Sequence, residues 1–146
     1  MLCRDVMKPE VARCLETLSV QACAQMMRDN NIGFVPVLDA DKQVVGVVTD
    51  RDLALRVLAE NLPPETPVGH VMTRDVRICH PEDELRAAEW KMSAVRKSRL
   101  VVADDRGRCV GVISLSDIAQ ADNRNRAGSV LRAVTRREAP AHVVLS

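Results

Sequence analysis

Two short segments carry the residues of this 146-residue chain best suited to bind a ligand. The first reads Gly46-Val-Val-Thr49-Asp-Arg51-Asp52, and the second reads Gly111-Val-Ile-Ser114-Leu-Ser116-Asp117. In each, a hydroxyl residue precedes a predicted helix and an acid follows three residues later, a pattern typical of an N-cap. The same groups offer N–H and hydroxyl donors to a phosphate and a carboxylate to ribose hydroxyls. A glycine ahead of the helix allows close backbone approach. The motifs therefore favour helix capping and ligand binding at the same residues.

The two motifs belong to an internal repeat that a shift of 65 positions reveals. The shift superposes the segment from position 6 to position 54 on later residues without a gap. Identical pairs include Val6/Val71, Met7/Met72, Cys14/Cys79, Met27/Met92, Asp39/Asp104, Gly46/Gly111 and Asp52/Asp117. Because the motif recurs at matching points of both units, the repeat shifts the balance from capping alone towards function.

Both units are expected to contain the same elements in the same order. The first unit predicts a helix over 19–30 capped by Ser19, strands over 34–38 and 43–48, and a helix from 49 to 58 with apolar Leu55 and Leu58. The second predicts a helix over 84–95, strands over 99–103 and 108–113, and a helix from 114. Pro36 lacks an N–H, so its strand should lie at a sheet edge or turn that position outward.

The chain divides into repeat 1 (1–60), a linker (61–66), repeat 2 (67–122) and a basic tail (123–146). Units of this size lie near the lower limit for independent folding, so we expect one α+β domain with a joint core and pseudo-twofold symmetry. The tail predicts a helix with Val130, Leu131 and Val134 as its apolar stripe, followed by a frayed end. Its five arginines against one glutamate give it a net charge of +4.

Composition excludes several classes of protein. Basic and acidic residues number 21 and 20, and aromatic residues make up 1% of the chain, which argues against nucleic-acid binding and base-stacking surfaces. No apolar run of about 18 residues exists, so no membrane span is expected. Five scattered cysteines without a CxxC pair predict reduced thiols in the cytoplasm and no metal site. The three histidines suggest no catalytic dyad.

Several segments resemble a tandem pair of cystathionine-β-synthase (CBS) domains, also called a Bateman module. They are Asp5-Val-Met7, His70-Val-Met72, Ile32 to Asp39, Val45 to Leu53, and Ser98 to Asp104 followed by Gly111 to Ile118. The resemblance implies two βαββα units around a pseudo-twofold axis, with two equivalent clefts. It further implies a regulatory sensor rather than an enzyme, no obligatory cofactor, and AMP, ADP, ATP or S-adenosylmethionine as regulatory ligand. A homodimer of such pairs and a protein effector are the implied partners.

The resemblance also assigns roles to individual residues. Asp52 and Asp117 would hold ribose hydroxyls, while Thr49 and Ser114 would contact ribose or phosphate. Arg51, Ser116 and Arg99 would lie near phosphates, and the apolar segments near Cys14 and Cys79 would border adenine. Repeat 2 has Arg99 where repeat 1 has Phe34, so the Asp117 cleft is expected to bind a charged nucleotide more tightly.

Two alternatives stay open at this point. The chain could be an interaction or dimerisation module with empty clefts, although both motifs are intact. The basic tail could instead dock nucleic acid or an acidic partner, but five arginines are few for a phosphate footprint.

Overall fold

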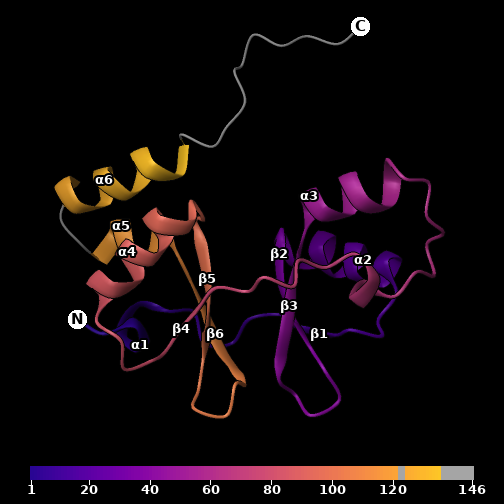
Figure 1. Ribbon diagram of the computed structural model, residues 1–146, viewed down its shortest axis with the longest axis horizontal. Helices are drawn as coiled ribbons and strands as arrows, with labels where there is room; N and C mark the ends of the chain where they lie inside the picture. Colours follow the sequence, from indigo (N-terminus) through magenta and orange to yellow (C-terminus); the bar gives the residue numbers. More distant parts are fainter. Residues whose placement is uncertain (122–123, 136–146) are drawn as a thin grey trace, which may run out of the picture.

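A computed structural model of the chain describes residues 1–121 and 124–135. Two three-stranded sheets stand side by side in the middle, and helices cover their outer sides (Figure 1). The strands are β1 (Cys14–Leu15), β2 (Phe34–Leu38), β3 (Val44–Thr49), β4 (Ile78–Cys79), β5 (Arg99–Ala103) and β6 (Cys109–Ser114). The helices are α1 (Cys3–Val6), α2 (Val20–Asn30), α3 (Asp50–Leu53), α4 (Leu85–Val95), α5 (Leu115–Ala121) and α6 (Arg124–Thr135). A π-helical turn (Ala54–Leu58) extends α3, and a 3-10 turn (Val68–His70) precedes β4.

The two sheets have the same topology, which confirms the predicted repeat. In each, an antiparallel hairpin (β2–β3 or β5–β6) is joined by a short parallel strand (β1 or β4). The identical Asp39 and Asp104 close the hairpin turns, because one carboxylate oxygen of each accepts two backbone N–H groups at 2.9 Å. The predicted elements are confirmed to within one or two residues at their ends.

Ser19 caps α2 as predicted. Its Oγ accepts a hydrogen bond from the Ala22 N–H at 3.1 Å. At the other end Asn31 adopts a left-handed conformation with φ of 53°, and its counterpart Arg96 ends α4 with φ of 55°. The left-handed residue that stops the outer helix is therefore repeated in both units, whereas the side-chain cap is not, because Glu84 at the start of α4 makes no such hydrogen bond.

Pro36 lies in a central strand rather than at an edge, so the other predicted alternative holds: the position of its missing N–H faces away from the β3 ladder. β2 is flanked by β1 and β3, but β1 pairs only with Val37 and Leu38. Opposite Pro36, Val47 turns its N–H and C=O away from β2 and bonds both to Thr73, at 3.0 and 2.8 Å. No donor is needed from Pro36, because its neighbour on β3 faces the other way.

The leading segment of each repeat (residues 2–8 and 67–73) packs against the other repeat. Lys8 exchanges two backbone hydrogen bonds with Val112 of β6, as Thr73 does with Val47 of β3. Cys3 lies in the core formed by α4, β5, β6 and α5, whereas Val68, Val71 and Met72 lie in the core formed by α2, β2 and β3. Through this exchange the two repeats share a core, as expected. Each packed unit therefore contains the leading segment of the other repeat.

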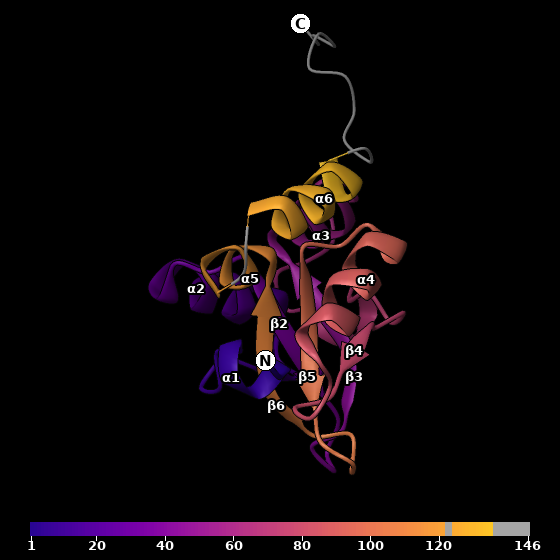
Figure 2. The same cartoon turned by 90° about the vertical axis from the view of Figure 1, so that its left-hand side faces the viewer.

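The helical faces of the two repeats differ. In repeat 2, α6 packs on α4 and α5, and its Val130 and Val134 are buried there (Figures 1 and 2). In repeat 1 no described helix covers α2 and α3, where Leu55 and Leu58 are 51% and 80% exposed. Leu131, the third residue of the apolar stripe predicted for α6, is 52% exposed, so Val130 and Val134 alone of that stripe are buried. The predicted frayed end, 136–146, lies outside the described residues.

Candidate functional site

Two clefts of about 430 and 440 Å³ are lined by residues of both repeats. Volumes of this order are typical of small-molecule sites. The first, called the Asp52 cleft, is lined mainly by Gly33, Phe34, Val47, Thr49 to Asp52, Leu55, Arg56, Thr73, Asp75 to Arg77 and Lys97 to Arg99. The second, called the Asp117 cleft, is lined by Lys8, Glu10 to Ala12, Asn30 to Phe34, Arg99, Val112, Ser114, Ser116 and Asp117.

Each cleft is composite. One wall of the Asp52 cleft is the cap of α3 in repeat 1, and the other wall is formed by 73–77 and 97–99 of repeat 2. The Asp117 cleft has the cap of α5 on one wall and 8–12 with 30–34 of repeat 1 on the other. The leading segments are exchanged, so the residues at their ends, 73–77 and 8–12, face the cap of the opposite repeat. A ligand in either cleft therefore contacts both repeats.

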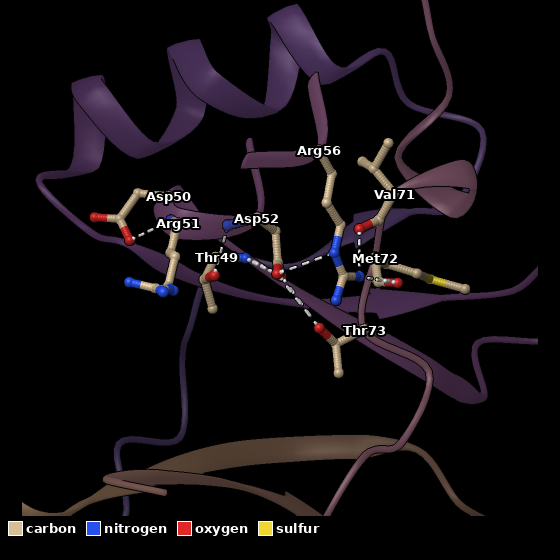
Figure 3. A network of polar contacts seen from close by, with 8 residues as sticks. All are labelled: Thr49, Asp50, Arg51, Asp52, Arg56, Val71, Met72 and Thr73. Atoms are coloured by element: carbon tan, nitrogen blue, oxygen red, sulfur yellow. Dashed lines mark hydrogen bonds and ion pairs between the residues drawn. The ribbon is translucent and has the colours of Figure 1, made fainter. Parts of the chain in front are cut away.

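A network of polar contacts holds Asp52 at the base of its cleft (Figure 3). Thr49 and Asp52 form a capping box: the Thr49 N–H donates to Asp52 Oδ2 at 3.0 Å, and the Asp52 N–H donates to Thr49 Oγ1 at 3.1 Å. The Thr73 hydroxyl lies 3.4 Å from both carboxylate oxygens, and Arg56 Nε lies 3.8 Å from Oδ1. Asp52 is 9% exposed, so its carboxylate is already well supported by protein donors.

Asp117 has the same cap but fewer other partners. The Ser114 N–H donates to Asp117 Oδ2 at 2.9 Å, and the Asp117 N–H donates to Ser114 Oγ at 3.1 Å. The hydroxyls of Ser114 and Ser116 lie 2.9 Å apart. Lys8, at the position of Thr73, places its Nζ 3.7 Å from Asp117 Oδ1, and its side chain is 73% exposed. Helix capping is thus confirmed for both motifs, and both caps also line a cleft.

The clefts differ in charge at equivalent positions. Arg51, Arg77 and Lys97 line the Asp52 cleft, whereas Ser116, Ala12 and Ile32 occupy the matching places of the Asp117 cleft. Arg56 adds a further cation on the Asp52 side, although its guanidinium also donates to the carbonyls of Val71 and Met72, at 3.0 and 3.1 Å. The Asp117 cleft gains Lys8 in exchange. Asp50 and Asp75 also line the Asp52 cleft, and Asp75 Oδ2 lies 3.2 Å from Arg77 Nη2. Five cations against three acids still favour phosphate there over the Asp117 cleft, which has two of each.

We expected the Asp117 cleft to bind a charged nucleotide more tightly because repeat 2 has Arg99, and the structure does not support this reason. Arg99 and Phe34 each line both clefts, so Arg99 is not a property of the Asp117 cleft. The loop that carries Lys97 and Ser98 into β5 lines the Asp52 cleft, because each cleft borrows this loop from the opposite repeat. Sequence alignment of the repeats pairs residues correctly but does not show this crossover.

Gly46 and Gly111 lie outside both clefts. They face the exchanged leading segments instead. A Cβ atom at Gly46 would lie 2.5 Å from Met72 Sδ, and one at Gly111 would lie 2.7 Å from the Lys8 carbonyl oxygen. Their position explains the glycines by close packing between repeats rather than by approach to a ligand.

Other cleft residues escape the sequence motifs. Thr73, Arg77, Lys97 and Lys8 line the clefts from segments far from the caps that they face. The one signal for them is the repeat itself, which marks 8 and 73 as equivalent. The segments near Cys14 and Cys79 do contribute, through Val11 and Ala12 in one cleft and Val76 and Arg77 in the other, but each crosses to the opposite repeat's cleft.

Two further properties concern the described part of the chain. Residues 1–121 and 124–135 contain no helix with the length and apolar character needed to cross a bilayer. In the same residues, histidine, cysteine and acidic side chains form no group of three that could hold a metal ion. All five cysteines are free and buried.

Comparison with known proteins agrees with this architecture. The family model for the CBS domain matches residues 3–59 and 68–124. The CBS domain-containing protein YhcV of Bacillus subtilis is 33% identical over 129 residues, covering 88% of this chain and 91% of its own. Hypoxic Response Protein I, solved with two coordinated zinc ions, is 28% identical with a TM-score of 0.76, covering 84% and 99% of the two chains. The CBS domain pair of MJ0100, solved with 5′-methylthioadenosine and S-adenosyl-L-methionine, is 27% identical with a TM-score of 0.72, covering 83% and 94%.

Proposed function

Because the chain belongs to the CBS domain family and carries two such domains in tandem, we propose that it is a non-catalytic regulatory module that binds adenosine-containing ligands in its two clefts. The complex of the MJ0100 domain pair with two adenosine derivatives supports this ligand class. The buried free thiols support a reducing compartment such as the cytoplasm. The output passes to a partner protein.

The observation that carries the proposal is the paired cap and carboxylate at the base of each composite cleft. Asp52 and Asp117 accept hydrogen bonds from ribose hydroxyls, and Thr49 and Ser114 contact ribose or phosphate. Because each ligand touches both repeats, its binding free energy depends on how the repeats pack. Only a ligand with different affinity for two arrangements can shift them, and a ligand between the repeats meets that condition.

We further propose different ligands for the two clefts. The Asp52 cleft, with Arg51, Arg77 and Lys97, takes a phosphorylated adenosine such as AMP, ADP or ATP. The Asp117 cleft, where Ala12 and Ile32 replace two of those cations, takes a derivative without phosphate, such as 5′-methylthioadenosine or S-adenosylmethionine. Arg51 and Arg99 contact phosphates, and the Ser116 hydroxyl contacts the ligand of the Asp117 cleft.

Calorimetric titration with AMP tests this assignment. We expect Asp52→Ala to weaken the tighter AMP site by roughly 10–100-fold, since hydrogen bonds to a charged group are worth about 1.5–3 kcal/mol. Asp117→Ala should leave that site intact, as should the surface control Asp105→Ala. Loss of the tight AMP site in Asp117→Ala alone would mean that the Asp117 cleft, and not the Asp52 cleft, binds AMP more tightly. Absence of binding by AMP, ATP, adenosine and S-adenosylmethionine at millimolar concentration would favour a ligand-free interaction module.

A homodimer through repeat 1 completes the proposal. A groove of about 420 Å³ on α2 and α3 is lined largely by apolar residues, among them Val20, Leu53, Val57 and Leu58. Its equivalent on repeat 2 is already occupied by α6, which prevents two copies from using both faces at once. We expect Leu58→Glu to shift a dimer to monomer in analytical ultracentrifugation, with Leu131→Glu on α6 as the matched exposed control. A monomeric wild-type chain, or an unchanged dimer in Leu58→Glu, contradicts this interface.

A further inference from the structure

Arg99 stands at the wall between the two clefts. It begins β5 directly opposite Ser114 in the β5–β6 register, beside the cap of the Asp117 cleft. The two residues before it, Lys97 and Ser98, line the Asp52 cleft. Arg99 itself lines both clefts, so one guanidinium borders two candidate phosphate sites.

The Arg99 side chain is exposed and is not held elsewhere. Within residues 1–121 and 124–135 it makes no hydrogen bond or ion pair. Its counterpart in repeat 1 is Phe34, which begins β2 opposite Thr49 and also lines both clefts. Strict repeat symmetry would place two cations, or none, at this wall. The chain has one.

A single guanidinium binds one phosphate well but cannot bind two phosphates equally well at the same time. Its donors lie in one plane and pair with phosphate through two parallel hydrogen bonds, which fixes the direction in which the side chain points. When Arg99 is committed to one cleft, it cannot form the same pair of bonds in the other. Two anions on opposite sides of one cation also repel each other.

We propose that Arg99 makes the two clefts antagonistic toward phosphorylated ligands. This inference rests on the proposed function and adds a regulatory property to it. A phosphorylated adenosine in one cleft lowers the affinity of the other cleft for a second one, and linkage makes the effect reciprocal. An adenosine derivative without phosphate leaves Arg99 available. The favoured doubly bound state therefore holds one phosphorylated and one unphosphorylated ligand, so that the chain reports on the two together.

Calorimetric titration with AMP and with adenosine measures this antagonism. The affinity of the Asp117 cleft with its neighbour empty comes from Asp52→Ala, and its affinity with the neighbour filled comes from the second step of the wild-type titration. We expect the AMP affinity to fall by about tenfold when the neighbouring cleft fills, since one charge-assisted hydrogen-bond pair is lost. The adenosine affinity should be unchanged.

Two variants separate the Arg99 mechanism from a general change in shape. In the Arg99→Ala background, filling the neighbouring cleft should change the AMP affinity as little as it changes the adenosine affinity, although both clefts bind AMP more weakly. Phe34→Arg supplies a second guanidinium with both caps intact, and it should strengthen the second AMP step by about tenfold without affecting adenosine.

An equal fall in Arg99→Ala and wild type, or the same fall for adenosine as for AMP, would overturn the inference. AMP filling both wild-type clefts without antagonism overturns this inference and leaves the proposed function standing. AMP and adenosine failing to bind any of these folded variants overturns both together.

Discussion

The two clefts are built on the same frame and differ in the residues that face it. Each cap places a hydroxyl and a carboxylate at a helix N-terminus, with hydrogen bonds that agree to within 0.1 Å, as in the pairs at 3.1 Å. The facing walls differ: Arg77 and Lys97 in one correspond to Ala12 and Ile32 in the other. Duplication has thus kept the part of the site that recognises a ribose, while the exchanged walls have become free to differ in charge.

The largest expected difference between the repeats concerns the glycines under the exchanged segments. A Cβ at Gly111 would lie 2.7 Å from the backbone oxygen of Lys8, which cannot move alone. A Cβ at Gly46 would lie farther, 3.0 Å, from the equivalent oxygen of Thr73, and its shortest contact would be with the flexible side chain of Met72. We expect Gly111→Ala to lower the free energy of unfolding by about 3 kcal/mol and Gly46→Ala by about 1 kcal/mol in urea titration.

Gly128→Ala on α6 is the control for this pair. The nearest atom to its Cβ would be Arg132 Nη1 at 3.9 Å, so the change should be neutral or slightly stabilising. Equal losses in Gly46→Ala and Gly111→Ala would mean that the backbone and side-chain contacts give way with equal ease.

The helix caps at Thr49 and Ser114 should contribute equally to the stability of the two repeats. Thr49→Ala and Ser114→Ala each remove the oxygen that accepts the N–H of the third helical residue, and we expect each to cost about 1 kcal/mol of unfolding free energy. Thr17→Ala, at an exposed position, serves as the control in the same urea titration. A cost confined to one cap would show that the two helix starts are not equivalent despite their shared geometry.

Local signals allow the elements of this fold to be predicted, and tertiary packing explains the failures. Ser19, the turn aspartates and both capping boxes act within four residues of themselves, so a sequence is sufficient to place them. Pro36 is tolerated in a central strand because Val47 opposite it is bonded to Thr73, a contact across the repeats, and the sequence alone could not choose between this and an edge position. No periodicity in either strand reports such a partner.

In the candidate site, too, the residues with local signals were predicted and those placed by tertiary packing were not. The caps at Asp52 and Asp117 were predicted from spacing, and they line the clefts. The opposite walls were not predicted, because the crossover depends on where the leading segments lie in three dimensions. The same crossover moves Lys97 to the cleft of the other repeat. Close approach of other atoms to Gly46 and Gly111 was predicted correctly, but those atoms belong to the protein and not to a ligand.

Exchanging charge between the facing walls gives a smaller effect, on affinity. Arg77→Ala should weaken AMP in the Asp52 cleft by about threefold, and Ala12→Arg should strengthen AMP in the Asp117 cleft by a similar factor, because exposed charges act through water. Both effects should shrink in high salt. Arg106→Ala, in an exposed turn, is the matched control. Salt-independent changes, or an effect of Arg106→Ala as large as that of Arg77→Ala, would contradict the assignment of these walls to phosphate.

The smallest predicted difference concerns one ionisable group that repeat 2 has and repeat 1 lacks. Burial raises the pKa of the Cys109 thiol above its ordinary value of 9.0, whereas the equivalent residue of repeat 1 is Val44, which cannot ionise. The unfolded chain therefore loses this proton at a lower pH than the folded chain. The contribution of Cys109 to stability is complete below its ordinary pKa and is lost as the pH rises through that value towards the folded pKa.

Cys109→Val makes repeat 2 match repeat 1 at this position and so tests that contribution. Urea titrations near pH 8 and pH 10 should show a smaller loss of unfolding free energy in Cys109→Val than in wild type, by less than the cost of either cap. A hydrogen bond to a neighbouring thiol, of Cys23 and Cys3 respectively, and then burial raise the pKa of Cys14 and Cys79, and these groups act equally in both proteins. An identical alkaline loss in the two proteins would mean that Cys109 ionises at the same pH in the folded and unfolded chains, and that repeat 2 has no alkaline weakness of its own at this strand.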